Sequence, residues 1–374
     1  MNDITLVVLC AGESSRFALS VKKQWIRIDD EPLWLNVTNR LSSYSNFQKI
    51  IVVGHKDELN YMKNFSDNFT FVEGGNTRQQ SIVNALKFTE SEFVMITDVA
   101  RCCVPKNVVQ ELIVNKTKAS IIVPILNVSD TVIYNDETIN RENVKIIQTP
   151  QLSNTQLLKQ ATQTDIEFTD DSSAIRHIGG TIHYILGSNK SEKLTFGEEL
   201  QTLACLKKPN SNTFVGNGID IHQFENNKQM VLGGVKIDSQ VGFKAHSDGD
   251  VLIHSVIDSL LGACGAGDIG EFFPDTDPKY KGSDSKELLA FIVKFINNVG
   301  YDIINIDLTI LAQQPKINPY KMLIISTMAK LLNINNQKVN IKATTAEKMG
   351  FVGREEGVVV LSSATLKYNN WMNK

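Results

Sequence analysis

Thr5-Leu6-Val7-Val8-Leu9-Cys10-Ala11-Gly12 is the stretch of sequence that decides the fold of the first half of the chain. A short apolar run followed at once by small residues is typical of a buried strand and the turn after it. The stretch also has some likeness to a lipoprotein signal, but it lacks a basic leader and its apolar core is too short. We therefore predict a first strand over Leu6–Cys10 and a loop after it.

Similar apolar runs recur along residues 1–208, and amphipathic helical stretches alternate with them. The further predicted strands are Lys49–Val53, Phe93–Thr97 and Ala119–Pro124. The predicted helices are Leu33–Ser43, Thr77–Phe88 and Lys106–Lys116. This alternation favours a Rossmann-like α/β domain, with a mostly parallel sheet covered by helices on both faces.

A polar segment without periodicity, Lys207-Lys208-Pro209-Asn210-Ser211-Asn212, is the predicted linker. It separates a first domain over residues 1–208 from a second over residues 209–374. The second domain is predicted to have strands near 214–221, 303–311, 338–343 and 357–366, and helices near 250–262, 284–298 and 318–332. Because strands and helices are mixed, we expect an α/β layer domain.

Length and composition limit the class of protein. A chain of 374 residues is too long for one typical core. With 42% hydrophobic and 21% charged residues and a net charge of −3, we expect no broad basic surface for nucleic acid. No apolar run approaches the roughly 20 residues of a membrane span. The five cysteines suggest no disulfide framework, which favours a cytoplasmic location.

Asp220-Ile221-His222 and His254 offer one carboxylate and two imidazoles, a ligand set that suits zinc. Residues two apart share a face of a strand, so Asp220 and His222 can bind one metal. On a helix, His254 shares a face with Asp250 and Asp258, so a carboxylate can hold its second nitrogen. A lone Asp-x-His is usually a satisfied polar pair, but the full set predicts a catalytic zinc with an open fourth position.

The loop after the first strand has the features of a phosphate-binding loop. Ala11 and Gly12 let the backbone approach a ligand, and successive N–H groups can hold phosphate oxygens. Arg16 and Lys23 add charge that can stabilise an anion in its transition state. Alone, these residues are also consistent with an ordinary turn, and Lys22-Lys23 with a solvated surface pair.

Residues 1–208 resemble the 2-C-methyl-D-erythritol 4-phosphate cytidylyltransferases. The resemblance is carried by Leu9–Arg16, Lys23-Gln24-Trp25, Gly74–Arg78 with Ser81, Thr97–Arg101, Asp130-Thr131, Arg141, Thr149-Pro150-Gln151, Thr169-Asp170 and Lys193-Leu194-Thr195. It implies that methylerythritol phosphate attacks the α-phosphorus of CTP and releases pyrophosphate, with Mg²⁺ or Mn²⁺ on the triphosphate. Such chemistry depends mainly on positioning and charge neutralisation.

The resemblance also implies roles for single residues in this first domain. The cations expected to stabilise the five-coordinate phosphorus are Arg16, Lys23 and Lys193. The residues expected to bind the nucleotide are Ala11, Gly12, Gly75, Asn76, Ser81 and Asp98, the last at the ribose. The residues expected to hold the acceptor are Thr131, Arg141 and Thr169, the first two across a dimer interface.

Residues 213–370 resemble the 2-C-methyl-D-erythritol 2,4-cyclodiphosphate synthases. The matching blocks are His246–Asp250, Gly267–Gly270, Phe273–Asp277, Ala312–Lys316 and Lys342–Gly353. This resemblance implies a domain that trimerises. It also implies an intramolecular attack of a 2-phosphate on the β-phosphorus of a CDP-linked substrate, which closes a cyclic diphosphate and expels CMP.

For this second domain the resemblance implies zinc on Asp220, His222 and His254 and a second ion, Mg²⁺ or Mn²⁺, on Glu347. Thr345 is the expected catalytic hydroxyl. The expected substrate-binding residues are His246, Ser247, Asp268, Gly270, Asp275, Ala312, Lys316, Ala343, Thr344, Phe351 and Arg354. Taken alone, Glu347 would be a helix-end carboxylate and Asp275 a turn residue.

The chain departs from the usual family patterns at four places. Val21-Lys22 stands where a proline usually precedes the loop lysine, and Asn76 where an acidic residue is usual. Cys102 replaces a proline, and Ala346 replaces a frequent threonine. We expect these changes to affect rate and loop rigidity more than reaction class.

Together the two resemblances imply a bifunctional enzyme for the third and fifth steps of the non-mevalonate isoprenoid route, with a separate kinase between them as a candidate partner. Dimer contacts of one domain and trimer contacts of the other predict a hexamer. One alternative is a different sugar-phosphate nucleotidyltransferase, against which Thr131, Arg141 and Lys193 argue. The other is a decayed scaffold, which should have lost residues such as Lys23 or His254.

Overall fold

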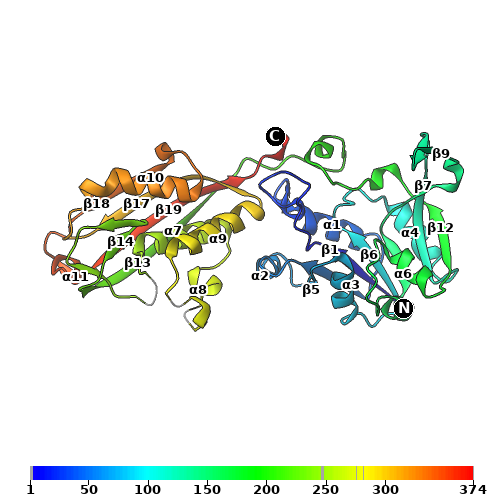
Figure 1. Cartoon of the computed structure of the whole chain (residues 1–374), viewed down its shortest axis with the longest axis horizontal. Coiled ribbons are helices and arrows are strands. Elements are labelled where there is room, and N and C mark those ends of the chain that lie inside the picture. Colours follow the sequence, from blue (N-terminus) through cyan, green and yellow to red (C-terminus); the bar gives the residue numbers. More distant parts are fainter. Residues whose placement is uncertain (1–2, 246–247, 275, 281, 374) are drawn as a thin grey trace. The chain divides into compact units, whose positions relative to one another are not determined.

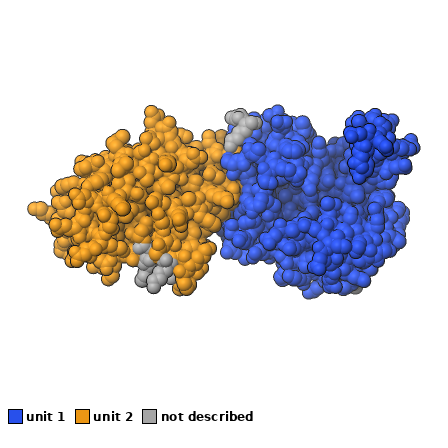
Figure 2. Space-filling view, in the orientation of Figure 1, with its two compact units in different colours: residues 1–209, 370–374 blue, residues 210–369 orange. Residues whose placement is uncertain are grey.

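The computed structural model describes residues 3–245, 248–274, 276–280 and 282–373. The chain divides into two compact units (Figure 2): residues 1–209 with 370–374 form unit 1, and residues 210–369 form unit 2. Each unit has its own sheet (Figure 1) and its own buried apolar side chains. In the described part of the chain, no helix is long and apolar enough to cross a membrane.

The sheet of unit 1 has the predicted first strand at its centre. Its strands are β1 (Ile4–Leu9), β4 (Lys49–Gly54), β5 (Thr70–Glu73), β6 (Phe93–Asp98), β7 (Ile121–Asn127), β10 (Lys145–Ile147), β11 (Gln151–Asn154) and β12 (Ile182–Leu186). They follow the order β10-β7-β11-β6-β1-β4-β5, and β12 also pairs with β7. β1, β4, β5 and β6 are parallel, as are β7 and β12, whereas β10 and β11 pair antiparallel with β7. The predicted mostly parallel sheet is therefore confirmed.

Apolar side chains are buried on both faces of this sheet. Val7, Ile51 and Ile96 contribute to a core shared with residues of three helices. Leu6 and Val8 point to the opposite face, because strand side chains alternate, and both are fully buried. The helices are α1 (Leu33–Ser42), α2 (Leu59–Lys63), α3 (Arg78–Leu86), α4 (Lys106–Val114), α5 (Thr155–Ala161) and α6 (Asp171–His177). The residues of α3, α5 and α6 belong to the first core, while α1 packs on β1 and α4 on β7 and β11.

Short elements that the sequence analysis did not predict complete unit 1. They are the hairpins β2 (Arg27–Ile28) with β3 (Glu31–Pro32) and β8 (Val132–Tyr134) with β9 (Glu137–Ile139), and the 3₁₀ turns η1 (Lys23–Trp25), η2 (Arg141–Asn143), η3 (Asn189–Ser191), η4 (Gly197–Gln201) and η8 (Trp371–Asn373). The β8–β9 turn has Asn135 and Asp136 at φ of 50° and 63°, as a two-residue hairpin turn requires. Ile133 and Tyr134 on this hairpin are each 67% exposed.

Two cysteines of unit 1 depart from the expectation drawn from the sequence. Cys103 and Cys205 form a disulfide in this structure, with Cα atoms 5.6 Å apart. The remaining cysteines, Cys10, Cys102 and Cys264, are buried and form no disulfide. The bonded residues are 102 positions apart, and such a distant pairing has no local sequence signal.

Unit 2 is built on a five-stranded sheet. Its strands are β13 (Thr213–Asn226), β16 (Val241–Phe243), β17 (Tyr301–Leu311), β18 (Val339–Thr344) and β19 (Gly357–Tyr368), in the order β16-β13-β19-β17-β18. A separate hairpin joins β14 (Met230–Leu232) and β15 (Val235–Ile237). The helices are α7 (Val251–Cys264), α8 (Ile269–Phe272), α9 (Ser285–Asn298), α10 (Lys321–Leu332) and α11 (Gly350–Gly353), with 3₁₀ turns η5 (Pro278–Tyr280), η6 (Asn318–Tyr320) and η7 (Asn336–Lys338). The predicted α/β layer domain is confirmed, and every strand and helix expected for it is present.

Helix α7 lies unusually close to the sheet. A Cβ atom at Gly216 would come within 2.2 Å of the Ser259 carbonyl oxygen, and one at Gly218 within 2.0 Å of the Ser255 carbonyl oxygen. Only glycine therefore fits at these two positions of β13. The close approach brings α7, which carries His254, against the strand that carries Asp220 and His222.

The opposite face of β13 and β19 is apolar and exposed. Val215, Ile219 and Ile221 are 64%, 60% and 55% exposed, and Leu361, which pairs with Ile219, is 40% exposed. These side chains alternate with the glycines that contact α7, so they belong to the face that α7 does not cover. Asn217 and Ser363 interrupt these apolar side chains, but so many of them exposed on one face is typical of an interaction surface.

Candidate active sites

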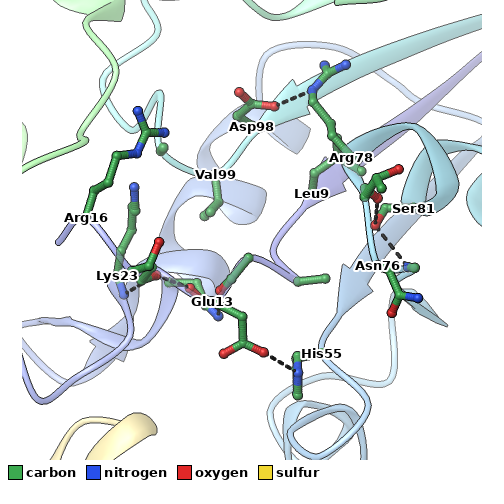
Figure 3. A pocket seen from close by; sticks show the side chains of 18 of the residues that line it. Leu9, Glu13, Arg16, Lys23, His55, Asn76, Arg78, Ser81, Asp98 and Val99 are labelled. Atoms are coloured by element: carbon green, nitrogen blue, oxygen red, sulfur yellow. Dashed lines mark hydrogen bonds and ion pairs between the residues drawn. The ribbon is translucent and has the colours of Figure 1, made fainter. Parts of the chain in front are cut away.

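A cavity of about 530 Å³ lies above the loop that follows β1 in unit 1 (Figure 3). Nine residues predicted from the sequence line it: Ala11, Gly12, Arg16, Lys23, Gly75, Asn76, Ser81, Asp98 and Lys193. Arg16 and Lys23 lie on one side, whereas Asn76 and Ser81 lie on the other. The structure thus brings together segments that follow β1, β5 and β6.

Close backbone approach shapes this cavity. A Cβ atom at Gly74 would come within 2.4 Å of the Ala11 Cβ, so glycine allows the loop after β5 to pack on the loop after β1. At Gly12, by contrast, a Cβ would meet nothing within 4 Å. Gly12 therefore faces open space in the cavity, where a ligand can approach the backbone.

The cationic side of the cavity is electrostatically strained. Lys23 Nζ donates to the Leu194 carbonyl oxygen at 2.7 Å. Burial lowers the pKa of Lys23, and the neighbouring charges of Lys193 and Arg16 lower it further. Three cations around one cavity repel one another, and a polyanionic ligand would relieve that repulsion.

Asp98 at the end of β6 is held between two cations. Its carboxylate accepts from Arg78 Nε at 3.1 Å and from Lys193 Nζ at 2.6 Å. Burial alone would raise the pKa of Asp98, but the charges of Arg78 and Lys193 hold it at about 2. Arg78 also donates to the buried Asp171 at 2.7 Å. Arg78 lies in a predicted motif but had no predicted role, and Asp171 was not predicted as a site residue.

Ser81 holds the loop after β5 in place. Its Oγ accepts from the Gly75 N–H at 3.1 Å and donates to the Thr77 carbonyl oxygen at 3.0 Å. The Thr77 side chain in turn caps α3 by accepting from the Gln80 N–H. Ser81 is 5% exposed, so its contacts support the loop that carries Gly75 and Asn76.

A second cavity of about 330 Å³ adjoins the first, because Arg78, Asp98 and Lys193 line both. Thr169 lines this second cavity, as expected for an acceptor site. Thr131 and Arg141 line neither cavity, since both lie exposed beside the β8–β9 hairpin. Arg141 Nη1 donates to the Ser129 carbonyl oxygen at 2.6 Å within the same hairpin.

Asp220, His222 and His254 of unit 2 form the predicted metal cluster, with one donor atom of each within 4.8 Å of the others. His222 Nδ1 and His254 Nδ1 lie 3.2 and 3.3 Å from Asp220 Oδ2. Asp220 Oδ2 and His222 Nδ1 are buried without a hydrogen-bond partner among the described residues. Burial would raise the pKa of Asp220, but its contacts with His222 and His254 lower it strongly. Unsatisfied buried donor atoms of this kind fit a divalent cation.

A hydroxyl group contacts the second ring nitrogen of His254. The prediction that the carboxylate of Asp250 or Asp258 would hold this nitrogen is wrong. Nε2 lies 3.0 Å from Ser285 Oγ, and that hydroxyl donates to Asp248. Because the hydroxyl proton goes to Asp248, Ser285 accepts from the Nε2–H of His254, which leaves Nδ1 free of a proton and able to bind a metal.

Asp250 and Asp258, the carboxylates expected to hold His254, make other bonds. Asp250 caps α7 and accepts from the Ile253, Gly233 and Gly234 N–H groups. Burial raises the pKa of Asp250 to about 6, although these N–H groups lower it. Asp258 accepts from the Ile269 N–H at 2.9 Å and so fixes the start of α8.

The predicted substrate segments of unit 2 lie at the far edge of its sheet. Ala343 and Thr344 end β18, and the Ala312 N–H donates to the Thr344 carbonyl oxygen at 3.0 Å. Two strands, β19 and β17, separate β18 from the β13 strand of the metal cluster. At about 4.8 Å per strand, this places them roughly 14 Å apart. One chain therefore does not bring this segment to its own metal cluster.

The remaining predicted residues of unit 2 are on its surface or outside the described part. Thr345 Oγ1 donates to the exposed Glu347 at 2.8 Å, and Glu347 is not part of the metal cluster found among the described residues. Asp268 caps α8, and the exposed residues are Asp268, Gly270, Lys316, Phe351 and Arg354. His246, Ser247 and Asp275 lie outside the described residues.

Comparison with known proteins identifies the family. The 2-C-methyl-D-erythritol 4-phosphate cytidylyltransferase family matches residues 4–206, and the YgbB family matches residues 213–367. The chain is 67% identical to the bifunctional enzyme IspD/IspF of Aliarcobacter butzleri and 50% identical to that of Campylobacter lari, each over 100% of both chains. The solved structure of the bifunctional IspDF from Campylobacter jejuni is similar, with a TM-score of 0.87 and 47% identity over 99% of this chain and 100% of that one.

The chain belongs to the bifunctional IspD/IspF family.

Membership of this family gives the chain two activities in isoprenoid biosynthesis. It transfers CMP from CTP to 2-C-methyl-D-erythritol 4-phosphate and releases pyrophosphate. It also converts 4-CDP-2-C-methyl-D-erythritol 2-phosphate to the 2,4-cyclodiphosphate and releases CMP. Family membership therefore decides against the two alternatives. These were another sugar-phosphate nucleotidyltransferase and a non-catalytic scaffold.

Proposed function

We propose that unit 1 carries out the CMP transfer and unit 2 the cyclisation, each at the site described above. The observation that carries this proposal is the contrast in chemistry between the two sites. Unit 1 has a cavity with three converging cations, and unit 2 has a cluster of one carboxylate and two imidazoles. A triphosphate needs charge neutralisation, whereas a compact three-ligand cluster suits a catalytic metal.

In unit 1, Lys23, Arg16 and Lys193 neutralise charge at the α-phosphorus of CTP. Burial lowers the pKa of Lys23 most, and the charges of Lys193 and Arg16 lower it further. This mutual repulsion supports the proposed role. The loop from Ala11 to Gly12 and the loop that carries Gly75 and Asn76 bind the nucleotide from opposite sides of the cavity. Mg²⁺ or Mn²⁺ supplies further charge neutralisation on the triphosphate when bound.

Ser81 and Asp98 act on this nucleotide site through their neighbours. Ser81 supports the base-binding loop through its bonds to Gly75 and Thr77. Asp98 lies at the ribose side and orients Lys193. Thr169 lines the adjoining acceptor cavity. Thr131 and Arg141 serve a partner subunit, because they stand exposed on the β8–β9 hairpin of their own chain.

In unit 2, Asp220, His222 and His254 hold Zn²⁺, which acts as a Lewis acid toward phosphate oxygens when bound. Asp220 Oδ2 fits this ion, because it is buried without a hydrogen-bond partner among the described residues and lies 3.2 and 3.3 Å from Nδ1 of His222 and His254. Glu347 holds a second ion, Mg²⁺ or Mn²⁺, near the hydroxyl of Thr345.

The substrate of unit 2 is bound by segments at the β18 edge of the sheet and at the start of α8. The diphosphate and cytosine contact Ala312, Lys316, Ala343 and Thr344, while Asp268 and Gly270 bind the ribose. The other members of this substrate set are His246, Ser247, Asp275, Phe351 and Arg354. Because β18 is roughly 14 Å from β13, we assign the two halves of the site to different chains.

The assembly that follows is a hexamer. The exposed apolar face of β13 and β19 supports a three-fold contact between copies of unit 2. The exposed β8–β9 hairpin supports a two-fold contact between copies of unit 1. One three-fold axis combined with two-fold contacts closes at six chains. The kinase of the intervening step is a candidate partner of this hexamer.

We propose a cytoplasmic location, although the Cys103–Cys205 disulfide departs from the cysteine pattern on which that expectation rested. In that reducing compartment Cys103 and Cys205 would be held as thiols rather than as the disulfide of this structure. Alkylation of the unfolded protein after rapid acid quenching of cells, followed by mass spectrometry, measures which form is present.

Selective metal removal tests the division of labour. The full chain is treated with a zinc-selective chelator in the presence of excess Mg²⁺, and both reactions are assayed alongside zinc content. We expect cyclisation to fall in proportion to the zinc removed and to return with added Zn²⁺, while CMP transfer is unchanged. Loss of both activities together, or full cyclisation by zinc-free protein, would contradict the proposal.

A further inference from the structure

A buried ion pair lies beneath the loops that form the cavity of unit 1. Glu58, between β4 and α2, is 1% exposed, and Lys22 is 5% exposed. Lys22 Nζ lies 2.8 Å from Glu58 Oε1. Lys23, the next residue, lines the cavity instead. The two adjacent lysines therefore have different environments, and only Lys23 can meet a ligand.

The Glu58 carboxylate also binds the residues on the other side of Lys23. Its Oε2 accepts from Trp25 Nε1 at 2.6 Å and from Gln24 Nε2 at 3.4 Å. Trp25 is fully buried and its ring stacks on Tyr61 of α2, with centroids 5.3 Å apart. One carboxylate thus contacts three of the four residues from Lys22 to Trp25, and the fourth is Lys23.

Gln24 connects this buried carboxylate to the phosphate loop. Its Nε2 donates to the Gly12 carbonyl oxygen at 3.1 Å, and its Oε1 accepts from Ser14 Oγ at 3.2 Å. Ser14 Oγ also accepts from the Lys23 N–H at 3.0 Å. The backbone of Lys23 is therefore fixed to the same network as the backbone of Gly12.

Lys22 carries the network to the rim of the cavity. Its Nζ lies 2.9 Å from Glu13 Oε2, and Glu13 Oε1 lies 2.7 Å from His55 Nε2 (Figure 3). Burial would lower the pKa of Lys22, but Glu58 and Glu13 raise it, so the side chain stays charged. A charged lysine this deeply buried requires its carboxylate partner.

We propose that Glu58 is a positioning residue for CMP transfer: through Lys22, Gln24 and Trp25 it fixes the segment that presents Lys23 to the triphosphate. This inference rests on the proposed role of Lys23 at the α-phosphorus. A displacement of about 1 Å in a catalytic group can cost on the order of 10²-fold in rate. Glu58 acts without contacting the ligand, since it lies beneath the loops and outside the lining of the cavity.

The test is a cycle of variants in the full chain: Glu58→Gln, Lys23→Ala and both together. Glu58→Gln keeps an acceptor for Trp25 and removes the charge that holds Lys22. We expect it to lower kcat for CMP transfer by about 10–100-fold and to change the KM for CTP less. In the Lys23→Ala background the same substitution should have little further effect, because the residue that it positions is already gone.

Three measurements separate positioning from general damage to the fold. Glu90→Gln, an exposed carboxylate of the same unit, is the matched control and should be fully active. All three tryptophans belong to unit 1, so fluorescence-detected unfolding shows whether that unit is folded, and cyclisation reports on unit 2. Lys22→Met combined with Glu58→Gln removes both buried charges and should recover at least about tenfold over Glu58→Gln alone. Should Glu58→Gln fail to fold, Glu58→Asp, which keeps the buried charge and shortens the side chain, takes its place in the cycle with Lys23→Ala.

The outcomes distinguish the inference from the function on which it rests. A multiplicative loss in the double variant Glu58→Gln with Lys23→Ala would overturn the positioning role, because it would mean that Glu58 acts independently of Lys23. Full activity of Glu58→Gln beside an impaired Lys23→Ala would also overturn it, and would leave the role of Lys23 intact. Near-normal transfer by Lys23→Ala would overturn both.

Discussion

The two units differ in how much of a site a single chain completes. In unit 1, loops that follow the adjacent strands β6, β1, β4 and β5 converge on one cavity, and nine predicted residues line it within one chain. In unit 2, the metal ligands converge on β13 and α7, whereas the substrate segments lie at the ends of β17 and β18. The carboxyl ends of adjacent parallel strands meet at one edge, which favours a site within one chain. In unit 2, β19 lies between β13 and β17 and is antiparallel to both, which fits the proposed sharing of the site between copies.

The exposed surfaces fit this contrast. Unit 2 leaves apolar side chains uncovered on the face of its sheet, where a second copy can pack. In unit 1 the exposed large apolar side chains are scattered, from Val114 and Leu186 to Ile133 and Tyr134 of the β8–β9 hairpin, while both faces of its sheet are covered by helices. This difference supports the proposal that unit 2 depends more on a neighbouring chain than unit 1 does.

The largest expected effect is on the metal cluster. His254→Ala should remove zinc and reduce cyclisation by more than the 10–100-fold typical of losing an outer-shell partner, because it deletes one of three ligands. CMP transfer should stay near normal. Zinc content and both activities are measured on one preparation, with His177→Ala, an exposed histidine of unit 1, as control. Equal loss of both activities in folded protein would break the separation of the two sites.

The next effect is on the cationic cavity. Lys23→Ala should reduce pyrophosphate release by about 10²–10³-fold, the usual effect of losing one electrostatic contact in the transition state. Cyclisation of supplied substrate should not change. Steady-state assays of both reactions decide this, with the exposed Lys118→Ala as the matched control. Near-normal transfer would show that Lys23 does not meet the reacting phosphate.

A smaller effect is expected from the residue behind the metal ligand. Ser285→Ala removes the acceptor of the His254 Nε2–H, so His254 no longer has a fixed tautomer. We expect zinc affinity to fall by about 10–100-fold, measured by competition with a chelator of known affinity. Unchanged zinc affinity would mean that the metal site does not depend on this hydroxyl.

The smallest effect concerns stability of unit 1. Folding lowers the pKa of Asp98 from 3.8 to about 2, so the ionised group contributes about 2 kcal/mol at neutral pH. That contribution is complete above about pH 4 and is lost as the pH falls toward 2. Asp98→Asn should therefore destabilise unit 1 at pH 7 and progressively less below pH 4. Tryptophan fluorescence during urea unfolding measures this difference, and a constant difference at all pH values would contradict it.

Local sequence patterns predicted the main helices and strands. They could not predict contacts between segments that are far apart in the sequence. The apolar runs at β1, β4 and β6 and the helical periodicity of α7 correspond closely to the structure. The short strands β5, β10, β11 and β12 and the short helices α2, α5 and α6 were missed, since three to seven residues give little periodicity. An apolar run or helical face is a local property, and local properties are what a single sequence reports.

The candidate sites show the same division. Ligand types at strand or helix spacing, such as Asp220 and His222, could be predicted from alternation alone. Glu58 and Ser285 could not, because a lone carboxylate or hydroxyl becomes informative only when folding brings it to Lys22 or His254. The carboxylate predicted beside His254 was wrong because helix capping and the start of α8 engage Asp250 and Asp258 instead.

Subunit complementation tests most directly whether unit 1 lines its cavity within one chain and unit 2 shares its site between chains. His254→Ala is co-expressed with Thr344→Ala/Thr345→Ala under different tags, and mixed oligomers are isolated. Our account predicts that cyclisation returns to between about a quarter and a third of normal, because mixed trimers contain sites with an intact half from each chain. The matched mixture of Lys23→Ala with Asn76→Ala should show no recovery of CMP transfer, since both residues line one cavity of one chain. Mixed oligomers without cyclase activity, or with restored CMP transfer, would contradict the account.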